Sequence, residues 1–127
     1  EVDSKNLKIA VVNRRAYDLW LSDNFKNAKI VRAKTIIESH KLFNEGKVDV
    51  LAGLKPKLIE ELAENKNLKI IDKPFTFIKQ SIGIKKGSVE ATKFLNDFIL
   101  KIISEGIIER LLKKHKLENK LSIPKIY

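Results

Sequence analysis

Short apolar runs alternate with amphipathic stretches along the first half of the chain. Residues 7–12 (LKIAVV) are nearly all apolar and rich in β-branched side chains, which is typical of a strand buried on both faces of a parallel sheet. The runs 29–33 and 48–54 have the same character, although Asp49 interrupts the second. The pattern therefore predicts strands at these three places.

Apolar residues recur at helical spacing between and after these strands. A helix is expected over 16–26. A second begins at Thr35, which can form a capping box with Glu38, and ends at Gly46. A third contains Pro56 in its first turn, where proline is tolerated. The alternation of strand and helix predicts right-handed βαβ units and an α/β fold with a doubly wound, mostly parallel sheet and flanking helices.

Later segments carry weaker strand patterns and a stronger helical pattern. A fourth strand is expected at 68–71, interrupted by Asp-Lys-Pro at 72–74, and residues 75–85 are expected to be extended. Ser88 can cap a long helix with an apolar stripe, and Gly106 separates this helix from a second helical piece. The fold should therefore end in C-terminal helices.

Composition narrows the chemistry. A chain of 127 residues is long enough for one main core. Cysteine is absent, which excludes disulfides, thiolate catalysis and cysteine–zinc sites. No apolar run approaches the roughly 20 residues of a membrane span. The polar segment that Glu1 opens lacks a leader pattern, so any export signal is expected outside this chain.

The net charge is +10, from 26 basic and 16 acidic residues. Such a charge suggests nucleic acid or another anionic surface as a partner. However, most of the basic residues are lysines spread over every segment, whereas a nucleic-acid footprint usually clusters on one face. We therefore favour scattered surface charge, expect no nucleic-acid partner, and keep polyanion binding as the lesser alternative.

Arg14 and Arg15 occupy the junction between the first strand and the first helix. Small residues are common there because they let a ligand approach the free N–H groups of the helix. A guanidinium adds bidentate hydrogen bonds to the preference of a helix N-terminus for anions. The pair favours an anionic solute, a carboxylate before phosphate or sulfate. The alternative is that one or both side chains extend into solvent.

Other polar residues give little support for catalysis or metal binding. His40 and His115 have no second ligand at metal spacing, so we expect both to be solvated and no metal to be bound. Asp49 has no paired carboxylate near it in sequence, which favours a structural hydrogen bond over acid catalysis. The glycines of 83–87 do not fit a phosphate loop. We expect no enzyme activity and no cofactor.

Four stretches in order carry a family resemblance: KIAVVNRRAYDLWL at 8–21, GKVDVLAGLKP at 46–56, QSIGIKKG at 80–87 and LNDFILKIISEGIIERLLKK at 95–114. Together they resemble the second half of the family 3, amino-acid-type extracytoplasmic solute-binding proteins of bacterial ABC importers. The resemblance covers nearly the whole chain, but the chain covers only about half of such a protein. It implies one lobe of a type II periplasmic-binding fold.

By this resemblance, residues 6–76 form the lobe, 77–117 hold a crossing strand and the C-terminal helices, and 118–127 form a tail. The helices after Ser88 would pack on the first lobe, which this sequence does not contain. Because exposing their large apolar side chains is unfavourable, we expect them to fold back on the sheet of this chain. Otherwise they would pair with a second copy by swapping or dimerisation.

The family binds its solute where strand ends meet helix starts, so the resemblance implies ligand contacts from Arg14, Arg15, Ala16, Tyr17, Gly53, Leu54, Lys55 and Gln80. Tyr17 is either a stacking wall or part of the core, and Gln80 is either a donor to the ligand or solvated. Many relatives have Gly then Ser or Thr where Arg14 and Arg15 stand, and an acidic residue where Leu54 stands. Both departures weigh against a standard α-amino acid ligand.

The resulting hypothesis is a module that binds a small polar, anionic solute, an amino acid or carboxylate-like molecule, for ABC-type import. It implies a periplasmic or extracytoplasmic location and a membrane permease as the partner of the full protein. One alternative is the extracellular ligand-sensing domain of a signalling protein. A less favoured one is a basic polyanion-binding protein.

Overall fold

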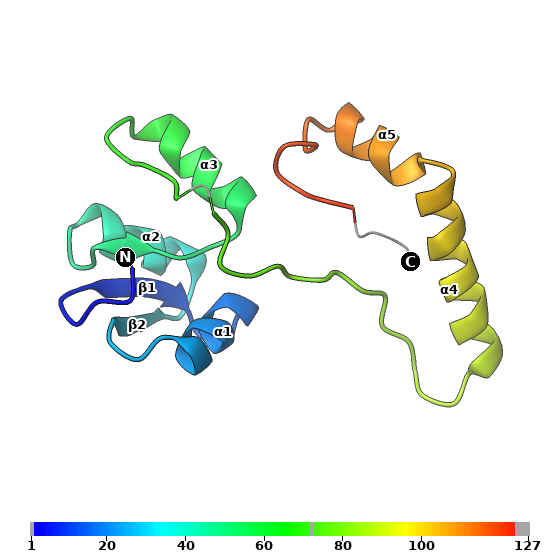
Figure 1. The fold of residues 1–127 in the computed structure, drawn as a ribbon, viewed down its shortest axis with the longest axis horizontal. Coiled ribbons are helices and arrows are strands. Elements are labelled where there is room, and N and C mark those ends of the chain that lie inside the picture. Colours follow the sequence, from blue (N-terminus) through cyan, green and yellow to red (C-terminus); the bar gives the residue numbers. More distant parts are fainter. Residues whose placement is uncertain (1, 72, 124–127) are drawn as a thin grey trace. The chain divides into compact units, whose positions relative to one another are not determined.

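The computed structural model describes residues 2–71 and 73–123 and divides into two compact units, 1–78 and 79–127. In the first unit, strands and helices alternate (Figure 1). Their bounds are β1 Lys8–Val12, α1 Ala16–Asn24, β2 Lys29–Ala33, α2 Ile36–Asn44, β3 Val50–Leu51 and α3 Lys55–Glu64. The second unit contains α4, Val89–Ser104, and α5, Ile107–Lys114. The predicted α/β class and the C-terminal helices are confirmed.

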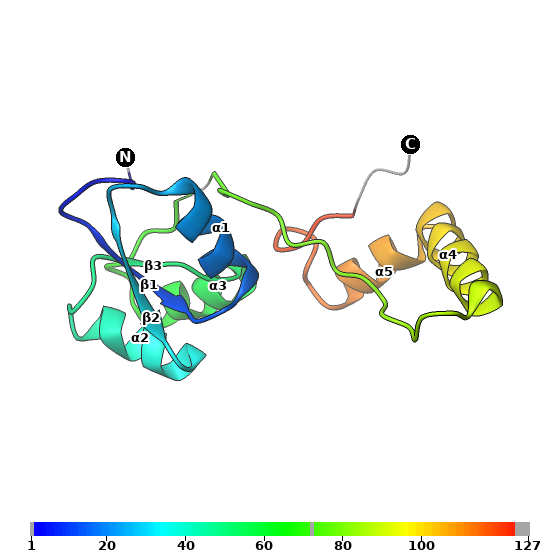
Figure 2. The ribbon, with the colours of Figure 1, turned by 90° about the horizontal axis from the view of Figure 1, so that it is seen from below.

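The sheet has three parallel strands in the order β2-β1-β3. β1 pairs along its whole length with β2, from Lys8 beside Lys29 to Val12 beside Ala33. Its ladder with β3 is short and joins only Ile9 to Val50 and Ala10 to Leu51. Helices α1 and α2 lie on opposite sides of this sheet (Figures 1 and 2). Both faces of β1 are therefore covered, as its continuous apolar run predicts.

The core of the first unit is built around β1. Ile9, Val11 and Val12 are buried there, and Leu21 of α1 and Ala52 after β3 pack with them. Each large aliphatic side chain removed from water in this way contributes about 1.5–3 kcal/mol. This packing holds α1 against the central strand. The turn between β1 and α1 is thus fixed to the buried part of the unit.

Thr35 caps α2 as predicted, but the return bond from Glu38 goes to the residue before the cap rather than to Thr35 itself. The hydroxyl of Thr35 accepts the N–H of Glu38 at 3.1 Å, and the Glu38 carboxylate accepts the N–H of Lys34 at 2.7 Å. Pro56 lies in the first turn of α3, also as predicted. Ser88 is the N-cap of α4, at the predicted position, but its side chain makes no capping hydrogen bond. There the Ser88 carbonyl accepts the hydroxyl of Thr92 instead.

The fourth strand predicted at 68–71 does not form, and the third is shorter than predicted. A strand is stable only when a neighbour accepts and donates its backbone hydrogen bonds. Since β3 contributes two residues to the ladder, it offers only a short edge to a further strand. The interruption at 72–74 begins with Asp72, which lies outside the described residues. Residues 75–85 are in neither helix nor strand.

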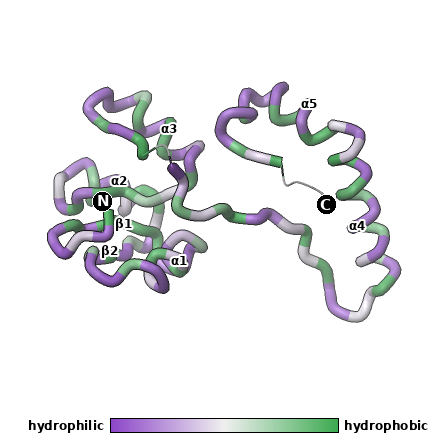
Figure 3. The backbone as a smooth tube through the Cα atoms, viewed as in Figure 1, coloured by the Kyte–Doolittle hydropathy of each residue, from purple (hydrophilic) through white to green (hydrophobic). Residues whose placement is uncertain are grey.

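In the second unit, α4 and α5 are joined at Gly106, whose φ of 66° is left-handed. Hydrophobic and hydrophilic residues recur along α4 (Figure 3). No residue of either helix is fully buried, and Phe94 and Phe98 of α4 are exposed. Of the predicted tail, residues 124–127 lie outside the described part. Among the described residues, no helix has both the length and the apolar character needed to cross a bilayer.

Candidate functional site

The turns that follow β1 and β3 lie at the same edge of the sheet, because these two parallel strands are neighbours. The ladder continues to the turn at the end of β1, where the N–H of Asn13 donates to Ala33 at 2.9 Å. Beside it, the N–H of Ala52 donates to Ala10 at 2.9 Å. In the strand order β2-β1-β3, the direction in which the chain winds reverses between β1 and β3, which is where open α/β sheets bind ligands.

Arg14 has an unusual backbone conformation. Its φ of 60° is left-handed, which costs a residue with a Cβ atom about 1–2 kcal/mol. Its N–H donates to Oδ2 of Asp18 at 2.8 Å, and this bond stabilises the conformation. Residues held in such strained conformations cluster at functional sites. Both the backbone conformation of Arg14 and its charge therefore make this turn a candidate functional site.

Several donors are available at the start of α1. Arg15 is the N-cap, and its carbonyl accepts the N–H of Leu19 at 3.1 Å. The N–H groups of Ala16 and Tyr17 have no acceptor among the described residues. The exposed guanidinium groups of Arg14 and Arg15 likewise make no hydrogen bond or ion pair within the described chain. Two cations and the positive end of a helix thus meet in one turn.

Beneath this turn, Asp18 is a buried acid, only 2% exposed. Its Oδ1 accepts Nε of Arg32 from β2 at 3.0 Å and the Ser22 hydroxyl at 3.3 Å. The Arg32 Nη2 atom also donates to the Ser22 hydroxyl at 2.7 Å. The sequence pattern places Asp18 in the first turn of the helix that follows the first strand, but it indicates no role for Arg32. The link between them depends on how β2 and α1 pack.

Tyr17 belongs to the core rather than to an exposed wall of the turn. It is 7% exposed and packs in the same cluster as Ile9 and Leu21. Burial raises the pKa of its phenol. Ala16, by contrast, is exposed at the start of the helix. Of the two alternatives for Tyr17, the structure thus selects the core.

The turn after β3 contributes backbone groups and one cationic side chain, that of Lys55, to the candidate site. The carbonyl of Leu54, the N-cap of α3, accepts the N–H groups of Lys57 at 2.9 Å and Leu58 at 3.1 Å. Leu54 and Lys55 are exposed, and Gly53 is partly buried. A Cβ atom on Gly53 would meet Leu58 at an ordinary 3.5 Å, so no steric need for glycine arises there.

Gln80 is exposed and belongs to the second unit, whereas the turns belong to the first. Its contact with a ligand stays a prediction. Lys34 is a further exposed cation, and it follows β2 at the same edge of the sheet as the two turns. Sequence reasoning did not include Lys34 in the site.

His40 is not solvated as predicted. Its Nδ1 atom pairs with Oε2 of Glu61, and Asn44 donates to Oε1 of the same carboxylate at 2.8 Å. The hydrogen bond from Asn44 lowers the pKa of Glu61 most, and the bond to His40 lowers it further. Asp49 has the structural role expected of it, since its Oδ2 accepts the N–H of Lys8 at 2.8 Å.

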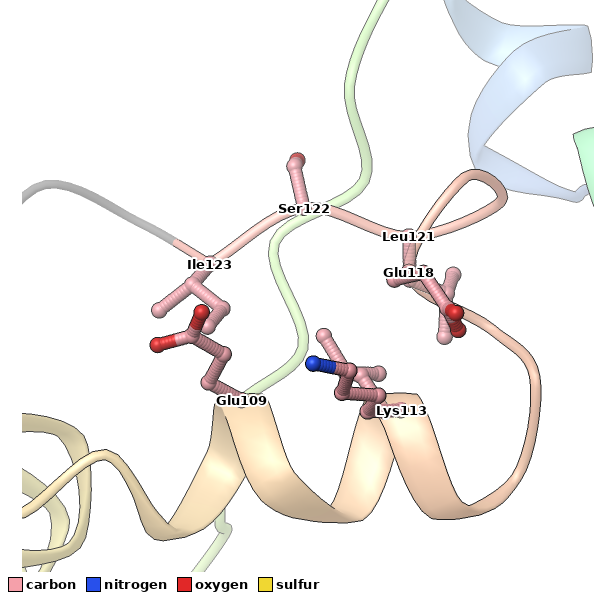
Figure 4. A pocket seen from close by; sticks show the side chains of 7 residues that line it. Glu109, Lys113, Glu118, Leu121, Ser122 and Ile123 are labelled. Carbon is pink, nitrogen blue, oxygen red and sulfur yellow. The ribbon is translucent and has the colours of Figure 1, made fainter.

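One hollow lies in the second unit, between α5 and residues 118–123, with a volume of about 480 Å³ (Figure 4). The side chains around it mix opposite charges with apolar groups: Glu109, Leu112, Lys113, Glu118, Leu121, Ser122 and Ile123. None of the predicted site residues lines it. Among the described residues, no group of three or more histidine, aspartate or glutamate side chains could hold a metal ion.

The first unit is an α/β lobe with a three-stranded parallel sheet flanked by helices, and it matches a lobe of a periplasmic-binding-like fold. The chain is similar to the ABC transporter glutamine-binding protein GlnH of Bacillus subtilis (strain 168), with 26% identity over 110 residues. The alignment covers 87% of this chain and 40% of that protein, so the chain spans less than half of its relative. No family model and no solved structure matches significantly. The distant similarity is consistent with part of an amino-acid solute-binding protein.

Proposed function

We propose that this chain binds a small anionic solute with a carboxylate group at the carboxyl edge of its sheet. The chain would form part of a solute-binding protein that delivers the solute to an ABC-type permease outside the cytoplasm. Its role is capture rather than catalysis. Arg14 and Arg15 hold the anion, with the first-turn N–H groups of α1 and the exposed Lys55 completing the half-pocket.

The observation that carries this proposal is the placement of Arg14 and Arg15 at the switch between β1 and β3. Neither guanidinium group makes a hydrogen bond or ion pair within the described chain, and the adjacent N–H groups of Ala16 and Tyr17 lack acceptors there. A carboxylate fits because its two oxygens can accept from a guanidinium fork and from backbone N–H groups together. The strained φ of Arg14 supports a functional role for the turn.

The GlnH relative is named for binding glutamine, an amino acid with a carboxylate. This chain offers no acidic side chain at Leu54 to meet an α-amino group, and its other turn carries two cations. Its preferred solute should therefore be more acidic than glutamine. Succinate and glutamate are suitable probes, because each carries two carboxylates.

Thermal unfolding tests the proposal with succinate, L-glutamate, L-glutamine and sulfate, each compared with sodium chloride of equal ionic strength. A ligand at about ten times its Kd stabilises the folded chain by roughly 1.4 kcal/mol. We expect succinate and glutamate to stabilise the chain more than glutamine does. Arg14→Ala and Arg15→Ala should each reduce the stabilisation by succinate and glutamate. Lys29→Ala removes an exposed cation at the start of β2, away from the two turns, and should leave the stabilisation by these ligands unchanged. Equal responses from all three variants would contradict the proposal.

A further inference from the structure

Asp18 lies close in sequence to Arg14 and Arg15, yet its charge is matched by a different arginine. Arg32, from β2, donates through Nε to Oδ1 of Asp18 at 3.0 Å. Among the described residues, the Asp18 carboxylate makes no ion pair with Arg14 or Arg15. Its sole bond to these two residues is the one it accepts from the backbone N–H of Arg14. Asp18, the acid nearest along the chain to Arg14 and Arg15, is thus paired with Arg32 and not with either of these two arginines.

Both oxygens of this carboxylate are engaged. Oδ2 accepts the Arg14 N–H at 2.8 Å, while Oδ1 accepts Arg32 and the Ser22 hydroxyl. The single Ser22 hydroxyl proton is shared between this oxygen and the Asp18 carbonyl, 2.8 Å away, while the hydroxyl oxygen accepts Nη2 of Arg32 at 2.7 Å. These bonds fix the orientation of the carboxylate below the turn. An acid buried to this extent needs such a partner, because an unpaired buried charge is strongly unfavourable.

We infer that Arg32 is a positioning residue for the anion site: by neutralising Asp18 and fixing its carboxylate on the Arg14 N–H, it leaves the guanidinium groups of Arg14 and Arg15 available to the solute. This inference rests on the proposed function. It extends the site to a residue that does not touch the solute. It also explains why an acid can lie next to an anion site without opposing it.

Loss of the Arg32 charge has a defined consequence. The Asp18 carboxylate then has no cation, and Arg14 and Arg15 are the nearest ones along the chain. A carboxylate that turns toward them competes directly with an anionic solute. Since exposed charge pairs contribute up to about 1 kcal/mol, the affinity for succinate should fall roughly twofold to fivefold.

The experiment is an NMR titration of the complete 15N-labelled chain with succinate. It compares wild type, Arg32→Ala, Arg32→Gln, Arg32→Ala with Asp18→Asn, and Lys29→Ala. Arg32→Gln keeps a hydrogen-bond donor for Asp18 but removes the charge, and amide spectra report whether each variant is folded. The Asp18→Asn change keeps a side-chain oxygen that can accept the Arg14 N–H while removing the competing negative charge. Lys29→Ala is the control for overall charge on the same strand.

We expect Arg32→Ala and Arg32→Gln to weaken succinate binding roughly twofold to fivefold, and Asp18→Asn to restore it in the Arg32→Ala background. Lys29→Ala should bind like wild type. A purely structural role for Arg32 predicts instead that Arg32→Ala loses native amide signals and that Asp18→Asn restores these signals together with binding. The inference requires weaker binding in a variant whose amide spectrum is still that of the folded chain. Lack of rescue, or wild-type affinity in both Arg32 variants, would therefore overturn the inference.

The Nε–H signals of Arg14 and Arg15 without ligand provide a separate measurement. They should shift in Arg32→Ala as the Asp18 carboxylate turns toward them, and unchanged signals would overturn the inference. If wild type does not respond to succinate, the proposed function fails on its own. Shifted ligand-free signals would still support the role of Arg32 in keeping Asp18 away from the two cations.

Discussion

The imidazole of His40 in α2 pairs through Nδ1 with the Glu61 carboxylate of α3, and this contact joins two helices through residues 21 positions apart. Both side chains are largely buried, at 19% and 15% exposure. Asn44, one turn after His40, binds the second oxygen of the same carboxylate. Because α3 begins at Lys55, within the turn that follows β3, this contact also helps to hold that side of the candidate site.

Glu61 should make the folding of the first unit sensitive to acid. Its folded pKa is lowered below the ordinary 4.5, so its stabilising contribution is complete above about that pH and is lost as the pH falls through the folded pKa. We expect the difference in unfolding free energy between wild type and Glu61→Gln to shrink from about pH 5 to about pH 3. Urea unfolding at several pH values measures this difference. Glu64→Gln, an exposed change on the same helix, should show no such trend.

Leu21 should be a major contributor to the stability of the first unit. It is 2% exposed and packs against β1, whereas Leu19 on the same helix is 56% exposed. Leu21→Ala removes buried methyl groups and leaves a cavity, so it should destabilise the fold by about 2–5 kcal/mol. Leu19→Ala should change stability by less than about 0.5 kcal/mol. Chemical unfolding of the two variants checks this contrast, and equal losses would place the core elsewhere.

The strands and helices around β1 could be predicted because their information is local. The apolar run at 7–12 is too hydrophobic for a half-exposed strand, and Thr35 with Glu38 marks the start of α2 within four residues. Residues 68–71 show a similar apolar pattern but form no strand, because a strand also needs a neighbour to bind its backbone groups. The sheet edge beside β3 is set by tertiary structure and cannot be read from the segment itself.

The same distinction applies to the candidate site. Arg14 and Arg15 stand out because a strand-to-helix junction is recognisable in the sequence. The role of Asp18 could not be read in the same way, since Arg32 reaches it only when β2 lies beside β1 in the observed register. The sequence pattern places His40 in solvent because its partner Glu61 belongs to a different helix.

Arg14→Gly should separate stability from solute binding. Glycine adopts a φ of 60° without the Cβ penalty, so the substitution should stabilise the fold by up to about 1 kcal/mol while removing one candidate ligand for the anion. At Arg15, the N-cap of α1, the φ of −80° suits any residue, so Arg15→Gly relieves no strain and should not give the stabilisation expected at Arg14. Thermal unfolding with and without succinate measures both effects. Destabilisation of the same size at both positions would contradict the role of the backbone conformation.

Trp20 should report on the segment that follows α3. It is the sole tryptophan, and its ring lies 5.2 Å from that of Phe75 and 6.2 Å from that of Phe25, measured between centroids. Phe75→Ala should expose the indole, shift its fluorescence emission to longer wavelength and destabilise the first unit by about 0.5–1.5 kcal/mol. Phe77, which has no ring contact within the described chain, provides the control substitution Phe77→Ala. Identical spectra for both variants would show that the contact does not persist in solution.

The apolar stripe of α4 should be covered in solution, by the sheet of this chain or by a second copy. Phe94 and Phe98 lie one helical turn apart, at 69% and 45% exposure, and large exposed apolar patches mark association sites. If a second copy covers them, sedimentation velocity should show a species heavier than one chain that dissociates on dilution. Replacing both by serine should then give monomers.

Lys93 and Asp97 form an ion pair of 3.0 Å at the same helical spacing, and both are well exposed. Replacing these two by serine matches the number and spacing of the changes while leaving the apolar stripe intact. It should therefore not alter association. If the chain instead folds back on itself, wild type sediments as a monomer with slow amide exchange along α4. A monomer whose α4 amides exchange rapidly would contradict both arrangements, because the stripe would then remain in contact with water.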